Sequence, residues 1–247
     1  NQNISIRKRL FFTATPRHYD IRKNKDGDYR SYASMDDESV YGRVAYRLSF
    51  KRAVDEKIIC PYKIVISVIR SEQVTNKVLK RTSVLVKRRA KHAEDVAKQL
   101  ALTAAAKKTN AKRMISFHGG IRRAESFKES IGDHLTGYEL FHVSGQQNAS
   151  ARANHMRDFA ECERALITNA RCLTEGVNVP TVDLVAFIDP RQSSIDIAQA
   201  AGRAMRRPRN YDKKFGYIVV PLFLEQRRGE SEEAALKRSG FEGVATV

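Results

Sequence analysis

Cysteines, long apolar runs and acidic residues are all scarce in this sequence, and each shortage excludes a class of protein. The cysteines form no CxxC pair, which excludes a zinc ribbon and a disulfide framework, so free thiols are expected at Cys60, Cys162 and Cys172. No apolar run approaches the ~20 residues that cross a bilayer. The amino-terminal stretch NQNISIRKRL lacks the zones of a secretory signal, which predicts an intracellular, cytoplasmic protein without a membrane partner.

The shortage of acidic residues leaves a strong positive charge. The chain has 45 Lys and Arg against 28 Asp and Glu, a formal net charge of +17. A polyanionic partner is therefore expected, and nucleic acid is the first candidate. An anionic membrane surface is the alternative, although no basic helix with a bulky apolar face is evident. None of the 6 histidines stands beside another ligand at metal spacing, so no metal site is predicted.

Apolar stretches alternate with helical patterns along most of the chain. Strands are predicted at 62–69, 113–118, 138–144, 164–169, 182–189 and 216–224. Between them, apolar stripes at helical spacing run through 93–104 and 149–160. This alternation predicts a three-layer α/β/α domain whose mostly parallel sheet is covered by helices on both faces. In such sheets ligands bind at the carboxyl ends of the strands, so the loops after the strands are where chemistry is expected.

Two of these loops lead into helices and carry groups that suit phosphate. GGIRR, which begins at Gly119, places two glycines and two arginines at a helix start, where free N–H groups can bind an anion. The next loop begins at Ser144 and leads to Asn148, a predicted helix N-cap. Taken singly, both loops are equally typical of ordinary helix starts.

A third loop, ARCLTEGVNVPTVD at 170–183, separates two predicted strands. Gly176 lets the backbone approach a ligand closely, while Glu175 and Asn178 can reach a ribose hydroxyl or neighbouring backbone. A tight turn that Gly and Asn permit explains the same residues.

The stretch QAAGRAMRR predicts a helix with a polar face. Gln199, Gly202, Arg203 and Arg206 are spaced i, i+3, i+4 and i+7, so all four are expected on one side of the helix. The alternative interpretation is a surface helix whose last arginines complement the helix dipole.

Taken in order, TATP, ISFH, VSG, TNARCLTEGVNVP and QAAGRAMRR resemble motifs III, IV, IVa, V and VI of superfamily 2 helicases. The likeness is greatest to the predicted helicases of restriction and mobile-element systems. It implies a RecA-like fold, with ATP and Mg²⁺ bound between two RecA-like lobes and mainly by the amino-terminal lobe of the same polypeptide. Asn178 stands where an aspartate is usual, so the ribose contact there is expected to be an uncharged hydrogen bond.

The resemblance also implies a role for particular residues. The expected catalytic residues at the γ-phosphate, with Arg206 as the arginine finger, are Gln199, Arg203 and Arg206. The expected nucleotide-binding residues are Glu175, Gly176, Asn178 and Gly202. The expected nucleic-acid contacts are His118, Arg122, Ser144, Thr168, Asn169 and Arg171. The residues expected to couple the two lobes are Thr13 and Thr15.

The same resemblance divides the chain into parts. Residues 1–16 correspond to the last strand of the preceding lobe, 17–60 to a linker, 61–225 to the carboxy-terminal RecA-like domain and 226–247 to a helical extension. The sequence contains no GxxxxGK[ST], and its acidic DDES follows TATP although a Walker B box precedes it in this family. The chain by itself is therefore expected not to hydrolyse ATP.

The second lobe of an ATP-dependent DNA helicase or translocase is thus the leading hypothesis, with nuclease or methyltransferase domains as further partners. The alternative is a non-catalytic nucleic-acid-binding module that keeps the RecA-like fold. Phe117, Phe141 and Phe187 are predicted to lie in the core, so no aromatic stacking platform is expected. Binding should tolerate any nucleic-acid sequence and weaken with salt.

Overall fold

The computed structural model describes residues 8–13, 16, 34–70, 89–170, 182–189, 194–208, 213–224, 229–231 and 234. Contacts divide the chain into two units, Asn1–Arg52 and Ala53–Val247. All described strands belong to the second unit.

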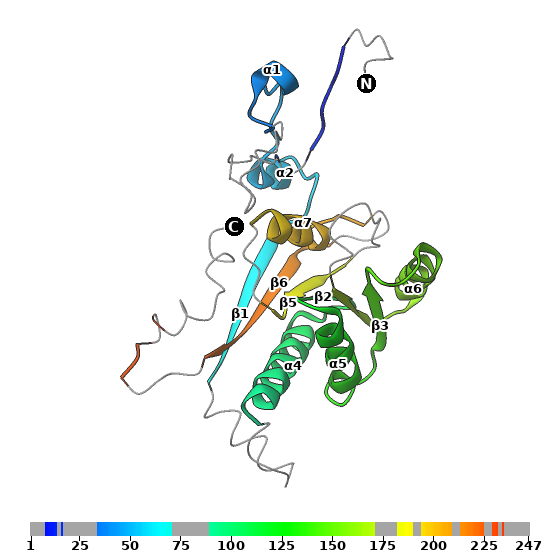
Figure 1. Cartoon of the computed structure of the whole chain (residues 1–247). Coiled ribbons are helices and arrows are strands. Elements are labelled where there is room, and N and C mark those ends of the chain that lie inside the picture. The colour runs from blue at the N-terminus through cyan, green and yellow to red at the C-terminus, as the bar shows by residue number, and fades with distance from the viewer. Residues whose placement is uncertain are drawn as a thin grey trace, which may run out of the picture. The chain divides into compact units, whose positions relative to one another are not determined.

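The second unit is built on one six-stranded sheet in which every described pair of neighbouring strands is parallel (Figure 1). In spatial order its strands are β1 (Tyr62–Arg70), β6 (Gly216–Leu224), β5 (Leu184–Phe187), β2 (Arg113–His118), β4 (Ala165–Ala170) and β3 (Glu139–Ser144). Each of the six predicted stretches overlaps one of these strands, and only β1 and β4 extend beyond the prediction, each by one residue. The parallel sheet confirms the predicted fold class.

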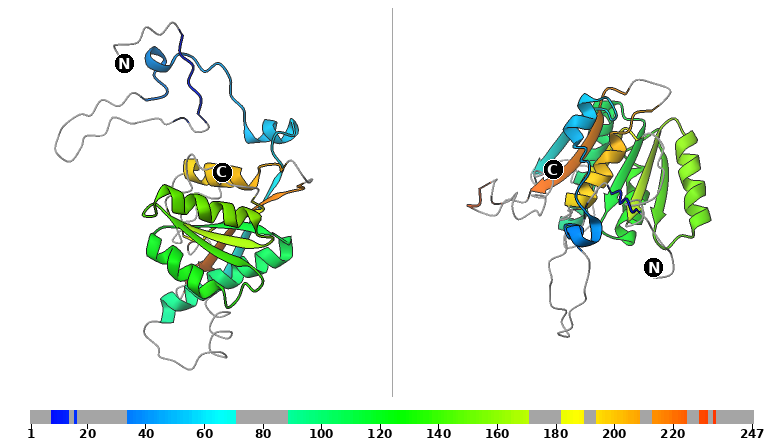
Figure 2. Two further views of the ribbon diagram at one scale, coloured as in Figure 1. Left: turned by 90° about the vertical axis from the view of Figure 1, so that its right-hand side faces the viewer. Right: turned by 90° about the horizontal axis from the view of Figure 1, so that it is seen from above.

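Helices cover both faces of the sheet (Figure 2). On one face α4 (Arg89–Thr109) and α5 (Ile121–Ile131) contribute to one buried cluster, and on the other α6 (Ala149–Glu161) and α7 (Ser194–Ala204) contribute to a second. Strand residues alternate between the clusters as the period of two requires, so Met114 faces α4 and α5 whereas Ile115 faces α6 and α7. This is the three-layer arrangement of a RecA-like domain.

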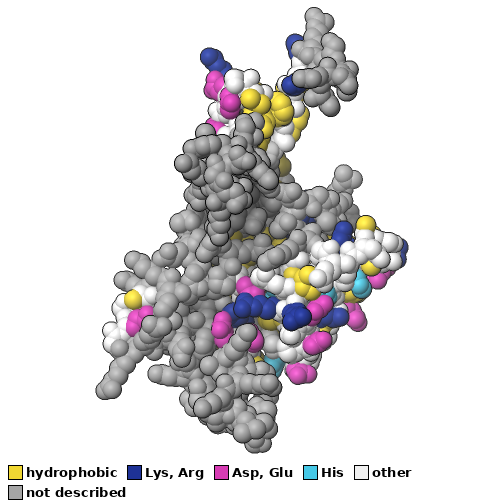
Figure 3. All heavy atoms as spheres, in the orientation of Figure 1, with side chains coloured by type: hydrophobic (Ala, Val, Ile, Leu, Met, Phe, Trp, Pro, Cys, Tyr) yellow, Lys and Arg dark blue, Asp and Glu magenta, His cyan; other side chains and the backbone are white. Residues whose placement is uncertain are grey.

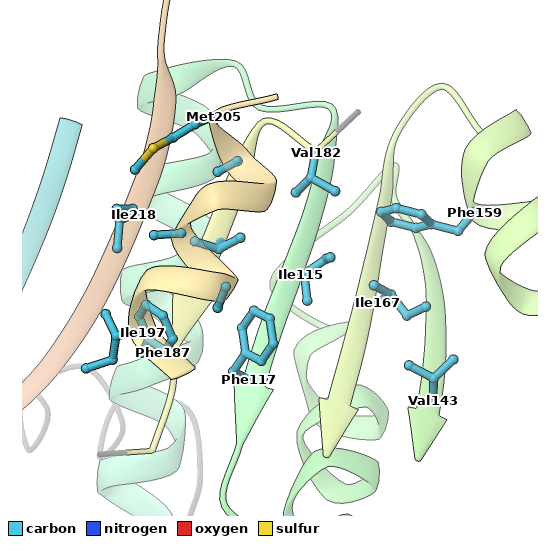
Figure 4. Packing of buried hydrophobic residues seen from close by; sticks show 14 of the residues in the cluster. Ile115, Phe117, Val143, Phe159, Ile167, Val182, Phe187, Ile197, Met205 and Ile218 are labelled. Atoms are coloured by element: carbon cyan, nitrogen blue, oxygen red, sulfur yellow. The ribbon is translucent and has the colours of Figure 1, made fainter. Parts of the chain in front are cut away.

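The cluster beneath α7 fixes that helix on the sheet (Figure 4). Phe117 of β2 and Phe187 of β5 are fully buried and stack with ring centroids 5.6 Å apart. Ile197 of α7 is buried in the same cluster. Burial of each such side chain contributes about 1.5–3 kcal/mol. Phe117 and Phe187 are therefore core residues, as the sequence predicts.

The first unit departs from the expected strand at its start. Residues 8–13 and 16 form no strand, and the side chains of Leu10 and Phe12 are largely exposed. A strand requires a neighbour to pair its backbone groups, and no strand is described within 1–52. The same unit holds the short helix α1 (Glu38–Tyr41), capped by Asp37, and the first half of α2 (Phe50–Asp55). The assignment of residues 1–16 to the last strand of a preceding lobe stays a prediction, because no described residue of this unit supplies the neighbouring strands of such a lobe.

Among the described helices, none has the length and apolar character needed to cross a bilayer.

Candidate functional site

The strand register brings several predicted nucleic-acid contacts together at the carboxyl ends of three strands. β4 lies between β2 and β3, and its Ala170 is in register with both His118 and Ser144. Thr168 and Asn169 lie just before Ala170 on the same strand. Sequence spacing alone could not give this register, because the three strands come from segments tens of residues apart.

Two of these side chains turn out to be buried beneath α5. His118 packs its ring 4.9 Å from that of Phe127 and shares a 2.9 Å hydrogen bond with Ser116. Thr168 Oγ1 lies 2.9 Å from His142 Nδ1. Both His118 and Thr168 are only 1% exposed, so they fill the layer between the sheet and α5.

His142 extends this buried polar layer towards the helix. Its Nε2 lies 3.8 Å from Glu125 of α5, and burial lowers the pKa of its imidazole below the ordinary value. The neutral ring is therefore favoured, with Nδ1 engaged by the hydroxyl of Thr168. This role could not be predicted from the sequence, because His142 is separated from Thr168 by 26 positions.

The junction between β2 and α5 is one of the exposed parts of this edge. Gly119 and Arg122 are exposed, and the N-cap Gly120 makes no side-chain hydrogen bond that would cap the first turn of α5. A helix start without a side-chain cap, beside an arginine, is suited to a phosphate. Ser144 and Asn169 are buried at the neighbouring strand ends.

A carboxylate that the motif analysis missed holds this junction. Asp189 lies just after β5, and its Oδ2 accepts a 2.8 Å hydrogen bond from the backbone N–H of Gly119. Its Oδ1 lies 3.0 Å from Nη1 of Arg123 and 3.8 Å from Nζ of Lys98. The sequence signal that could have identified Asp189 is an aspartate shortly after a buried strand.

The helix α7 ends earlier than its sequence pattern predicts. It stops at Ala204, and Arg206 instead forms an isolated antiparallel bridge with Ile59. The expectation that Arg206 shares one helical face with Arg203 is therefore wrong. Arg206 is exposed, whereas Arg203 is 7% exposed, so the two arginines lie in different environments.

Contacts from distant residues fix the end of α7. A Cβ at Gly216 would lie 2.2 Å from the carbonyl oxygen of Ala204, so only glycine permits this approach of the helix to β6. The ammonium of Lys213 donates to the carbonyls of Ala204 and Val182, and burial lowers its pKa. The backbone N–H of Cys60 donates a 2.9 Å hydrogen bond to the carbonyl oxygen of Met205. We refer to Cys60, Lys213 and Gly216 as the α7 clamp.

The part of the chain that forms this site is similar to a known protein family. Residues 92–208 match the family of the helicase conserved C-terminal domain. The matched segment runs from α4 to just beyond α7. This part of the chain is therefore similar to helicase C-terminal domains.

Similar proteins share more of the chain than this domain. The solved structure of the ATP-dependent Type ISP restriction-modification enzyme LlaBIII bound to DNA is 29% identical, with a TM-score of 0.70 over 94% of this chain and 16% of that one. The probable helicases A859L of African swine fever virus isolate Pig/Kenya/KEN-50/1950 and strain Badajoz 1971 Vero-adapted are 24% and 26% identical over 89% of this chain. The chain spans 23% of these viral relatives. These findings confirm the resemblance to superfamily 2 helicases.

The other predicted site residues lie on α7, in the first unit or outside the described residues. Gly202 is a half-buried residue of α7, and no described atom lies within 4 Å of where its Cβ would be. Gln199 lies on the same helix, and its side chain is outside the described part. The remaining positions outside the described residues are Thr15, Arg171, Glu175, Gly176 and Asn178. Thr13 is an exposed residue of the first unit.

Proposed function

We propose that this chain supplies the second lobe of an ATP-dependent superfamily 2 DNA helicase or translocase of a restriction or mobile-element system. In this proposal α7 and the residues after it contribute arginines to ATP bound between two lobes, and the carboxyl edge of the sheet grips DNA. The likeness to a restriction enzyme whose structure contains DNA supports the choice of DNA. As an isolated piece the chain lacks the phosphate-binding loop and is expected to be inactive.

The observation that carries the proposal is the fixed end of α7 beside open space. Gly202 costs a helix about 1 kcal/mol relative to alanine, and no described neighbour requires a glycine there. A residue without a side chain directly before Arg203, and four positions before Arg206, leaves room for a bound phosphate group. The α7 clamp holds the backbone that carries both arginines. A fixed backbone keeps their positive charges in place before the reaction, and such preorganised charge stabilises a transition state.

The residues present fit a nucleotide phosphate. ATP with Mg²⁺ supplies the phosphoryl group whose transfer to water releases energy. Arg206 is exposed and can reach a phosphate from outside the domain, and its planar guanidinium suits phosphate better than a lysine does. Arg203 is almost buried, so its side chain keeps a fixed position on α7. Gln199 is proposed to place the attacking water.

The carboxyl edge of the sheet is proposed to hold the DNA backbone. Arg122 and the uncapped start of α5 offer donors to phosphate without reading bases. His118, Ser144, Thr168 and Asn169 lie behind this surface as buried residues. Their direct contact with DNA stays a prediction, as does that of Arg171. Binding through phosphates should weaken steeply as salt rises.

The decisive experiment measures ATP hydrolysis with and without duplex DNA. The chain is assayed alone and joined to the polypeptide encoded upstream of Asn1. We expect no hydrolysis by the chain alone and DNA-stimulated hydrolysis by the longer protein. Replacing Arg206 with alanine in the longer protein should lower the rate by about 10³–10⁵, and Arg203→Ala should also lower it strongly.

A surface arginine provides the control for these variants. Arg157 lies exposed on α6 and pairs with the neighbouring Asp158, so Arg157→Ala should hydrolyse ATP at the wild-type rate. Full activity of both Arg203→Ala and Arg206→Ala would refute the arginine-finger assignment.

A second function is favoured by the missing phosphate-binding loop. A RecA-like domain without this loop can serve as a non-catalytic module that binds nucleic acid. Under that alternative the longer protein binds DNA but does not hydrolyse ATP. The hydrolysis assay therefore separates the two functions.

A further inference from the structure

Asp189 stands where two parts of the proposed machinery meet. It follows β5, whose chain continues to α7 at Ser194, and its carboxylate contacts the junction between β2 and α5. The N–H of Ile188 also donates to the carbonyl of Phe117 at 3.1 Å, so the ends of β5 and β2 are joined by backbone as well as by side chain. One residue therefore touches the proposed DNA edge and lies on the segment that leads to the arginine helix.

The carboxylate is held by groups of unequal accessibility. The side chain of Asp189 is 9% exposed and that of Lys98 is 5% exposed, while Arg123 is 59% exposed. Lys98 is also 2.7 Å from Glu94, so two acidic and two basic groups balance at this point. In Figure 3 basic and acidic side chains intermingle over the face that carries α4 and α5. These partners stabilise the buried carboxylate of Asp189, because burying a carboxylate without a partner costs a large desolvation free energy.

The exposed partner gives DNA a route to this cluster. Arg123 follows Arg122 in the first turn of α5, at the surface proposed to meet DNA phosphates. A phosphate and the carboxylate of Asp189 are both anionic acceptors for the same guanidinium, so a nearby phosphate competes with Asp189 for it. The other two partners, Gly119 N–H and Lys98, keep Asp189 attached to the sheet while its contact with Arg123 changes.

We propose that Asp189 is a positioning residue that couples DNA binding at the β2–α5 junction to ATP hydrolysis at α7. The inference rests on the proposed function and adds the residue through which the two sites communicate. Asp189 contacts neither ATP nor DNA in this scheme. It acts through Gly119 and Arg123 on one side and, on the other, through its own place at the end of β5, the strand that precedes α7 in the chain.

The test uses Asp189→Asn in the longer, DNA-stimulated protein. Asparagine keeps an oxygen that can accept from Gly119 but loses the charge that attracts Arg123. We expect the ratio of the ATPase rate at saturating DNA to the rate without DNA to fall about tenfold, within the usual range of coupling between sites. The matched control is Glu163→Gln, which removes the exposed ion pair with Lys112, 3.5 Å long, just before β4 and should keep the wild-type ratio.

A double-mutant cycle with Arg123→Gln shows whether the two residues act through each other. If they do, the double variant loses about tenfold in the ratio, whereas independent effects would multiply to about a hundredfold. Arg123→Lys keeps the charge and should restore much of the ratio. If a thermal melt shows that Asp189→Asn does not fold, the Arg123 variants test the coupling role instead, because Arg123 is exposed and its replacement should leave the fold intact.

The outcomes separate this inference from the proposed function. If the wild-type protein shows no DNA-stimulated hydrolysis, both the proposed function and the coupling role are refuted. A stimulated wild type with an unchanged ratio in Asp189→Asn and Arg123→Gln overturns the coupling role alone. A change in the DNA concentration for half-saturation, with the ratio at saturation intact, assigns Arg123 to DNA binding and likewise overturns the coupling role.

Discussion

Replacing Gly216 with alanine tests the α7 clamp most directly. The new Cβ would lie 2.2 Å from the oxygen and 2.7 Å from the carbon of the Ala204 carbonyl, and both are backbone atoms that cannot rotate away. Relief requires the end of α7 and the start of β6 to separate by roughly 1 Å, in a core packed as tightly as an organic crystal. Overpacking of this kind costs about 1–3 kcal/mol, and the shift also weakens the bonds from Lys213 and Cys60. We therefore expect a loss near the upper end, about 2–3 kcal/mol.

Thermal and urea unfolding measure this loss. For a domain of this size a destabilisation of 2–3 kcal/mol lowers Tm by roughly 4–12 °C. The control is Gly145→Ala in the exposed turn after β3, where no described atom lies within 4 Å of the new Cβ. Equal Tm values for Gly216→Ala and Gly145→Ala would refute the clamp, because the carbonyl of Ala204 would then have room to move at no cost.

Two further substitutions test the local interactions around the site. Asn148 caps α6 by accepting a 2.7 Å hydrogen bond from the N–H of Ala151, so Asn148→Ala should cost about 1 kcal/mol and lower Tm by roughly 2–4 °C in a thermal melt. Since burial lowers the pKa of His142, the unfolded chain takes up a proton that the folded chain resists, and stability should fall as pH drops below about 6.5. Urea titrations at pH 7 and pH 5 should show a smaller fall for His142→Asn, which keeps a polar group near Thr168.

The sheet was predictable because its strands are buried on both faces. Such strands are continuous apolar runs, and RMISFH and GYIVVPLFL coincide with β2 and β6 at both ends. Their alternation with helical stripes requires crossover connections, which in turn require parallel strands. The predicted cap at Asn148 was also correct, because a cap depends on residues only a few positions away.

Predictions failed or fell short where distant residues decide the outcome. The apolar stretch LFF is expected to pair only within a preceding lobe, and no described strand of the first unit offers its backbone a partner, so its assignment stays a prediction. Thr168 and His118 were placed correctly at strand ends, but their burial under α5 depends on which way each strand faces. Asp189 was missed because its partners Gly119 and Lys98 lie about 70 and 90 positions away.

The end of α7 shows how such distant contacts alter a functional interpretation. Periodicity assumes that the helix continues, and on that assumption Arg203 and Arg206 project together as one rigid pair. In the fold, Arg203 is held by the helix whereas Arg206 is held by its bridge to Ile59, a residue that precedes the sheet. The position of one arginine relative to the other is therefore set by the α7 clamp and by the segment around Ile59, not by helical geometry. A guanidinium carried on a short bridged segment can be placed independently of its neighbour, so under the proposed function the two arginines would approach one phosphate from different directions.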